Sequence, residues 1–204
     1  MKLIGERLAA LRGERVVFRN VDIEVGSGDL LTLHGPNGSG KTTLLRVLAG
    51  LLSIMSGRLS LLDDEAKPVT DEKRDRSLHF ISHQDSIRSQ LRVAETLQFH
   101  AALLGAPKKS VSPALEAWGL EKLAGHSGGL LSAGQRRRLS LARLSLQPRK
   151  LWLLDEPMTA LDAASRARLT DACSAHLAGG GMIVAATHEA FMGDPKVLQL
   201  GTRS

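Results

Sequence analysis

A glycine-rich loop between an apolar run and a helical pattern constrains this chain more than any other feature. Residues 35–43 read Gly-Pro-Asn-Gly-Ser-Gly-Lys-Thr-Thr, with the apolar run 30–33 before them and the helical pattern 44–49 after them. Glycines let the backbone take positive φ, so that successive N–H groups turn inward as an anion-binding nest. The helix that follows adds the positive end of its dipole. The segment therefore predicts a site for the phosphates of a nucleotide.

Two side chains of the loop have specific roles in such a site. Lys41 can reach the β- and γ-phosphates, and the Thr42 hydroxyl can ligate Mg²⁺. A glycine-rich turn that merely precedes a helix is the alternative, and the strand and helix around the loop favour nucleotide binding over it. The residues predicted to hold the phosphates are Gly35, Pro36, Asn37, Gly38, Ser39, Gly40, Lys41, Thr42 and Thr43.

Length and composition fit a single domain, 1–204, with one core. The chain has 204 residues, 43% of them apolar, which suffices for one good core with a small inserted subdomain. No apolar stretch reaches the roughly 20 residues of a membrane-spanning helix, and the N-terminus lacks a signal-peptide layout. We therefore expect a cytosolic protein, or one attached to a membrane only through partners. The single cysteine, Cys173, excludes an internal disulfide and is interpreted as a small buried residue.

The formal net charge of the chain is +6. An excess of positive charge is consistent with binding to nucleic acid, with binding to an anionic membrane surface, or with solubility alone. Nucleic-acid binders usually interleave basic residues with aromatic ones, whereas this chain has two tryptophans, four phenylalanines and no tyrosine. We expect no nucleic-acid partner, and we interpret the charge as a surface near anionic lipid or a basic nucleotide site.

The apolar pattern predicts an α/β chain. Periodicity and turn residues place a surface loop at 63–76 and a helical subdomain at about 85–130. The first three predicted strands form an antiparallel group, the last of which feeds the glycine-rich loop. Strands are expected at 16–18, 21–25, 30–33, 57–62, 78–82, 151–156 and 182–186, and helices at 44–49, 91–104, 113–124, 133–146 and 163–177.

A second anion-binding end is predicted at Ser132. This serine is well placed to cap a helix, with Gln135 three residues later as its capping-box partner, so the helix begins with exposed N–H groups. Three arginines follow at 136–138. They are either part of the anion site or a solvated helix face, and one or two of them are expected to be solvated.

Two carboxylates end the buried strand at 151–156. Because adjacent residues of a strand point to opposite sides, Asp155 can hold Mg²⁺ through water beside Thr42 while Glu156 polarises the attacking water. Gln84 follows another strand, where its amide can contact a metal-bound water. His188 follows a core strand at the carboxyl end, where ligands gather in open α/β sheets, so a γ-phosphate contact is favoured over a structural role.

The motifs together resemble those of ATP-binding-cassette ATPases, over nearly the whole chain. They occur in the family's order at 35–43, Gln84, 131–135, 153–156, 160–162 and His188. The resemblance implies a P-loop NTPase fold with a mixed central sheet, an antiparallel β subdomain and a small helical subdomain. It also implies ATP hydrolysis with Mg²⁺, for which Thr42, Gln84 and Asp155 are the implied metal contacts.

The same resemblance implies a head-to-tail dimer with ATP between two copies. The loop of one copy would be closed by Ser132, Gly134 and Gln135 of the other, and Asp162 would link the two sites. Glu156 would act as general base, His188 as γ-phosphate contact and Gln84 as the sensor towards the helical subdomain. The chain departs from the family in having Ala133 where glycine is commonest and Arg12 where an aromatic residue usually stacks on adenine, and an arginine plane can also stack on a base.

A narrower resemblance is to the ATP-binding (haem exporter) subunit of the bacterial cytochrome c maturation system. It is seen in the segments 81–84, 91–97, 131–138 and 151–157 and in the short ending after His188. It implies a peripheral protein on the cytoplasmic face of the inner membrane that couples ATP hydrolysis to an integral membrane permease subunit during haem handling. Direct haem binding by this chain is not expected, because no Cys-x-x-Cys-His motif is present. The alternatives are another transporter ATPase with a different cargo, a soluble non-transport cassette ATPase, and a P-loop kinase or switch.

Overall fold

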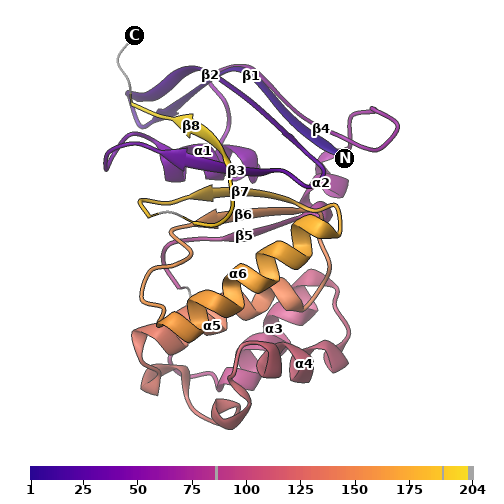
Figure 1. Ribbon diagram of the computed structural model, residues 1–204, viewed down its shortest axis with the longest axis vertical. Coiled ribbons are helices and arrows are strands. Elements are labelled where there is room, and N and C mark those ends of the chain that lie inside the picture. The colour runs from indigo at the N-terminus through magenta and orange to yellow at the C-terminus, as the bar shows by residue number, and fades with distance from the viewer. Residues whose placement is uncertain (86, 190, 202–204) are drawn as a thin grey trace. The chain divides into compact units, whose positions relative to one another are not determined.

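The computed structural model describes residues 1–85, 87–189 and 191–201, which form two compact units (Figure 1). The first unit comprises Met1–Ser82, Lys150–Pro157 and Cys173–Ser204, and the second comprises His83–Arg149 and Met158–Ala172. The second unit contains the range expected for the helical subdomain and continues beyond it.

A five-stranded sheet forms the centre of the first unit, in the order β5-β6-β7-β3-β8. Its strands are β3 (Leu30–His34), β5 (Leu78–Ile81), β6 (Leu151–Asp155), β7 (Met182–Ala186) and β8 (Lys196–Gln199). All four strand pairings are parallel, so the P-loop α/β fold is confirmed but the expectation of a mixed sheet is wrong in this detail. Strands β6 and β7 are buried at every position, as expected where both faces of a parallel sheet are covered.

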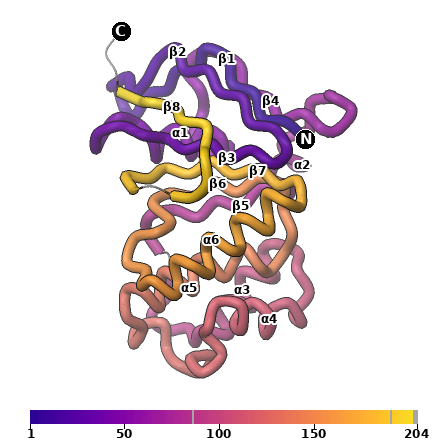
Figure 2. Tube along the Cα trace, viewed as in Figure 1, coloured from indigo at the N-terminus to yellow at the C-terminus, as the bar shows by residue number. Residues whose placement is uncertain are grey.

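An antiparallel sheet of three strands, in the order β2-β1-β4, is also part of the first unit (Figure 2). Its strands are β1 (Lys2–Arg12), β2 (Arg15–Gly26) and β4 (Ser56–Leu62). The strands predicted at 16–18 and 21–25 are one strand, β2. Asn20 takes a positive φ of 53° at an irregularity where the register with β1 shifts, and pairing with β1 continues on both sides of it. The run at 30–33, expected to be antiparallel, is β3 of the parallel sheet.

Six α-helices and four short 3₁₀ helices occur in the described residues, and α3, α4 and α5 lie together in the second unit (Figure 1). The α-helices are α1 (Lys41–Leu48), α2 (Asp71–Ser77), α3 (Val93–Leu104), α4 (Val111–Ala117), α5 (Ala133–Leu141) and α6 (Ala163–Ala178). The 3₁₀ helices are η1 (Lys108–Ser110), η2 (Glu121–Leu123), η3 (Gly128–Leu130) and η4 (Ala142–Ser145).

Two predicted elements differ from the structure. The surface loop at 63–76 contains helix α2, which Thr70 caps by accepting a hydrogen bond from the Lys73 backbone N–H. Ion pairs along this exposed helix compensate for the lack of apolar periodicity. The helix predicted at 113–124 is shorter, because Gly119 takes a positive φ of 60° after α4 and the chain then continues into η2.

The buried end of α6 packs on β6 within the first unit. His176 stacks on Trp152 with ring centroids 3.9 Å apart and planes 8° apart. Cys173, one turn earlier, is fully buried, as expected for a small core residue. In the described part of the chain, none of the helices has the length and apolar character required to cross a bilayer.

The buried thiol should be unreactive until the protein unfolds. Burial raises the pKa of Cys173 to about 12, so almost none of the nucleophilic thiolate is present at pH 8. We expect Ellman's reagent to label the native protein negligibly at pH 8 and to label it fully in urea. A Cys173→Ser variant gives the blank, and labelling of native protein at the rate of an exposed thiol would contradict the prediction.

Candidate active site

The glycine-rich loop joins β3 to α1, and two of its glycines are required by backbone angle and by space. Gly35 has a φ of 142°, and a β-carbon there would lie 2.3 Å from the Leu200 carbonyl oxygen. Gly40 has a φ of 104°, and a β-carbon there would lie 2.7 Å from Val17 Cγ1. Helix α1 begins directly after Gly40, so the loop presents its backbone to the same place as the helix N-terminus, as a phosphate site requires.

The Lys41 side chain is buried inside this loop, with 7% of the residue exposed. Its ammonium donates to the Gly35 carbonyl at 2.7 Å and to the Pro36 carbonyl at 3.4 Å. His188 Nε2 lies 3.2 Å from the same nitrogen. The positive charge is thereby fixed at the centre of the loop by three separate contacts.

Thr42 and Asp155 provide a set of oxygen ligands next to the lysine. The Thr42 hydroxyl lies 3.1 Å and 3.0 Å from the two carboxylate oxygens of Asp155 and donates to them. Asp155 is the last residue of β6 and is 2% exposed. A hydroxyl and a carboxylate are oxygen donors of the kind that Mg²⁺ prefers, so this pair fits the expected metal.

Glu156 lies just beyond β6, so the expected strand 151–156 is one residue too long. Its φ of 48° is unusual for a non-glycine residue, and its N–H donates to the Ala186 carbonyl at 2.9 Å. Glu156 Oε1 lies 3.4 Å from His188 Nε2. The two side chains are 21% and 49% exposed, so the carboxylate and imidazole remain accessible to water and substrate beside the buried lysine. Strained backbone of this kind is typical of functional sites.

The predicted capping box at the start of α5 is confirmed. The Gln135 N–H donates to the Ser132 hydroxyl at 3.2 Å, and the Ser132 N–H donates to Gln135 Oε1 at 2.8 Å. Gly134 faces another segment of the second unit, since a β-carbon there would lie 2.8 Å from the Ala160 carbonyl oxygen. Asp162, two residues after Ala160, accepts a hydrogen bond from the Ser165 N–H at 2.8 Å. Hydrogen bonds with Ser165 keep the pKa of Asp162 below its usual value.

The arginines at 136–138 do not form a solvated face. Arg137 is 2% exposed and pairs with Asp85 at 3.0 Å. Arg138 donates to the carbonyls of Trp118 and Gly119 at 3.1 Å and 2.9 Å, and Arg136 donates to the Leu131 carbonyl. The basic run therefore holds the second unit together, and the burial of Arg137 could not be inferred from its sequence.

The structure brings only some of the predicted site residues together. Lys41, Thr42, Asp155, Glu156 and His188 form one cluster in the first unit, whereas Ser132, Gly134 and Gln135 belong to the second unit. Gln84 is an exposed residue of the second unit, and Arg12 is the exposed last residue of β1. The contact of Leu200 with Gly35 was not predicted, because nothing in the C-terminal sequence indicates β8.

This cluster and the parallel sheet define a P-loop nucleoside triphosphatase. The model of the ABC transporter family matches residues 18–159. The chain is 45% identical over 188 residues to the cytochrome c biogenesis ATP-binding export protein CcmA of Nitrobacter winogradskyi, covering 92% of each chain. It is 43% identical over 201 residues to the protein of that name from Bradyrhizobium diazoefficiens, covering 98% of each.

Solved cassette structures have the same fold. An ABC transporter ATP-binding protein from Pyrococcus furiosus superposes with a TM-score of 0.82 at 25% identity, covering 98% of each chain. A dimeric post-hydrolysis cassette bound to ADP and phosphate superposes with a TM-score of 0.78 at 23% identity, covering 92% of this chain and 88% of that one. The chain belongs to the ABC transporter ATPases and, within them, to the family of cytochrome c biogenesis ATP-binding export proteins. It is a nucleotide-binding ATPase.

Removing the buried carboxylate should weaken the effect of magnesium on nucleotide binding. In Asp155→Asn the Thr42 hydroxyl keeps a neutral partner but the metal site loses its charge. We expect the affinity of the site for Mg²⁺ to fall by about 10- to 100-fold. The measurement is the binding of a fluorescent ATP analogue to the protein, titrated once in the presence of Mg²⁺ and once in EDTA. Asp171→Asn, an exposed carboxylate on α6, is the control, and an Asp155→Asn titration identical to wild type would exclude the assigned role.

Proposed function

We propose that this ATPase is the ATP-hydrolysing subunit of a membrane transporter complex that handles haem during the maturation of c-type cytochromes. The observation that carries the hydrolytic part is the cluster in which Lys41 contacts His188 and Thr42 contacts Asp155. The haem part rests on relatives at 43–45% identity that are named cytochrome c biogenesis ATP-binding export proteins.

In the proposed reaction, the loop at 35–43 cradles the phosphates and Lys41 neutralises charge on the β- and γ-phosphates. Thr42 and Asp155 would hold Mg²⁺, which when bound supplies electrostatic stabilisation of the phosphoryl group. Glu156 accepts a proton from the attacking water, and His188 contacts the γ-phosphate. The distance of 3.4 Å between Glu156 and His188 supports placing water and phosphate side by side.

A second copy of the chain would complete the site. Ser132, Gly134 and Gln135 of one copy would contact ATP held by the loop of the other, through the N-terminal end of α5. The contact of Gly134 with Ala160 supports coupling of this end to Asp162, the proposed link between the two sites. Gln84 would contact the metal shell and signal to the helical unit, and Arg12 would contact the base.

The proposed partner is an integral membrane permease subunit, with this chain attached peripherally to the cytoplasmic face of the bacterial inner membrane. Neither nucleic acid nor haem is a proposed ligand of the chain. An ABC transporter ATPase with a different cargo is the second candidate, because none of the residues described above recognises a cargo.

Mixing two inactive variants tests whether two copies share each site. Ser132→Arg should block the end of α5, and Lys41→Ala should remove the phosphate contact, so each variant alone should be inactive. Mixed together they should regain about a quarter of wild-type turnover, because random pairing makes half of the dimers mixed and each mixed dimer has one intact site of two. Phosphate release measures this, and full activity of either single variant would contradict the shared site.

Complementation tests the proposed role in cytochrome maturation. In a bacterium that lacks its own copy, the wild-type gene should restore covalent haem staining of c-type cytochromes, whereas Glu156→Gln should bind ATP but restore none, since it lacks the base. Asp171→Asn, produced at the same level, should restore staining fully. If staining never depended on the chain, the haem role would be excluded while the ATPase assignment would stand.

A further inference from the structure

Thr187 is a buried polar residue at the carboxyl end of β7, directly before His188. It is 2% exposed, and the strand that precedes it is apolar and buried at every position. Its backbone N–H donates to the Leu33 carbonyl at 3.4 Å, which continues the pairing of β7 with β3. Leu33 lies two residues before Gly35. Thr187 is therefore tied to the strand that leads into the phosphate loop.

The Thr187 hydroxyl closes a short ring of hydrogen bonds around His188. Its Oγ1 accepts a hydrogen bond from the Glu189 N–H at 3.1 Å and donates to the Glu189 carbonyl at 3.1 Å. Because both bonds span His188, they restrict the backbone from which its side chain projects. A valine at this position would have the same shape and could make neither bond. The hydroxyl is thus the part of Thr187 that packing in the core does not explain.

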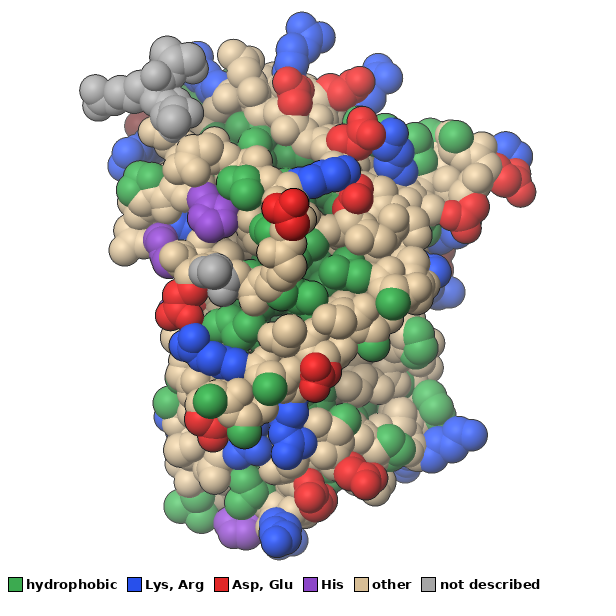
Figure 3. Space-filling view, in the orientation of Figure 1, with side chains coloured by type: hydrophobic (Ala, Val, Ile, Leu, Met, Phe, Trp, Pro, Cys, Tyr) green, Lys and Arg blue, Asp and Glu red, His purple; other side chains and the backbone are tan. Residues whose placement is uncertain are grey.

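The imidazole of His188 needs such a restraint, because packing covers only half of it. Its side chain is 49% exposed. Figure 3 shows that imidazole side chains of this protein reach the surface on the face drawn. An exposed side chain changes rotamer on the scale of picoseconds to nanoseconds. A fixed backbone at His188 reduces the number of places that the ring can occupy.

The position of His188 Nε2 matters because two groups of the active site lie next to it. Lys41 Nζ is 3.2 Å away and Glu156 Oε1 is 3.4 Å away. Both contacts are made by the same ring nitrogen, so a rotation that moves Nε2 loses both of them at once. A misplacement of about 1 Å at a reacting centre can cost about 100-fold in rate.

We infer that Thr187 is a positioning residue for hydrolysis, whose hydroxyl holds His188 in the orientation in which the imidazole contacts the γ-phosphate. The inference rests on the proposed γ-phosphate role of His188. Thr187 itself touches no reacting atom and acts through the backbone of His188 and Glu189. Loss of the hydroxyl should therefore slow hydrolysis of ATP. It should leave the binding of ADP unchanged, because ADP has no γ-phosphate.

Hydrolysis by variants of the full chain tests the inference, with single-turnover phosphate release to measure the slow ones. Thr187→Val should lower kcat by about 10- to 100-fold, with the Kd for ADP as in wild type. Thr187→Ser, which keeps the hydroxyl, should recover most of the lost kcat. His188→Ala should also be slow. Adding Thr187→Val to it should cause no further loss, since the residue through which Thr187 acts is then gone.

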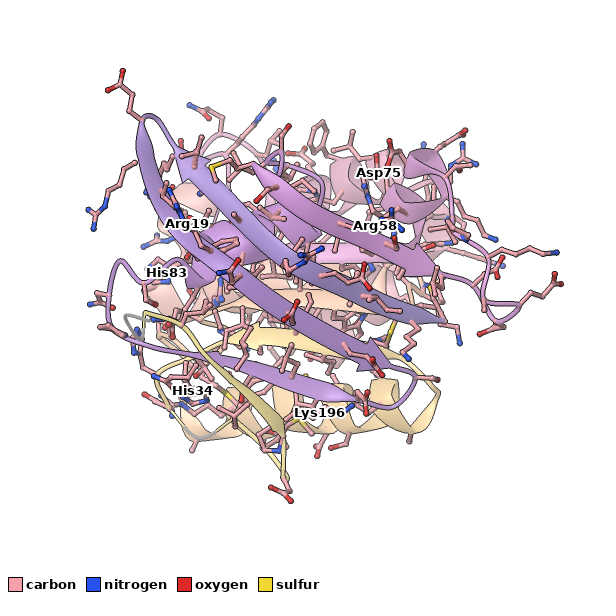
Figure 4. The ribbon with its side chains drawn as sticks, turned by 90° about the horizontal axis from the view of Figure 1, so that it is seen from above. Arg19, His34, Arg58, Asp75, His83 and Lys196 are labelled. Atoms are coloured by element: carbon pink, nitrogen blue, oxygen red, sulfur yellow. The ribbon has the colours of Figure 1, made fainter. Side chains whose placement is uncertain are left out.

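Thr32→Val is the matched control. Thr32 is a threonine of β3 that is 1% exposed, and its hydroxyl donates to the Lys196 carbonyl at 3.3 Å and lies 3.2 Å from His34 Nε2. Both of these neighbours are labelled in Figure 4. The control removes a hydroxyl from an equally buried position of the same sheet. It should lower the melting temperature about as much as Thr187→Val does and leave kcat at the wild-type value.

The outcomes separate this inference from the proposed function. Wild-type kcat in Thr187→Val beside a slow His188→Ala would overturn the positioning role and leave the role of His188 intact. A further loss in the double variant, or an equal loss of kcat in Thr32→Val, would show that Thr187 acts on folding and not through His188, and would also overturn it. Wild-type kcat in His188→Ala would overturn the γ-phosphate role of His188 and the positioning role together.

Discussion

The hydrogen bond from Thr42 to Asp155 joins two segments 113 residues apart and fixes the chemistry of the first unit. It forms because β3, β7 and β6 are consecutive in the parallel sheet, so their carboxyl ends lie on one edge. The loop leaves β3, Asp155 ends β6 and His188 follows β7. Any change in strand order would separate these groups, whereas loops elsewhere can vary without affecting them.

Two strained or crowded backbone positions maintain that edge. Gly35 lies against the carbonyl of Leu200, whose own N–H donates to His34 at 2.8 Å, so the segment after β8 supports the start of the phosphate loop. Glu156 has a positive φ and is held by a backbone bond to Ala186 at the end of β7. Both features depend on strands that are distant in sequence. The loop and the carboxylate are thus positioned by the sheet before any nucleotide binds, which lowers the cost of ordering them.

The parts of this site that could be predicted are those with a local physical signature. The run at 151–154 is apolar throughout, which predicts a buried strand. Ser132 with Gln135 is a capping box whose hydrogen bonds are local. Strand β8 could not be predicted, because it is a short edge strand with an exposed Lys196 and Gln199. The sequence favours a surface position for Arg137, whereas in the structure it is buried and pairs with the distant Asp85. The roles of Gln84 and Arg12 in the site remain predictions.

Base selectivity and hydrolysis are physically separable in this arrangement. The bond that breaks lies between the β- and γ-phosphates, beside Lys41, Glu156 and His188, and charge develops there in the transition state. Contacts to the base are the same in the ground state and the transition state, so they alter binding without altering the rate of the chemical step. A change at Arg12, the proposed base contact, would therefore alter nucleotide affinity and leave the chemical step unaltered. The phosphate loop allows no such freedom, because Gly35 and Gly40 have positive φ and lack room for a β-carbon.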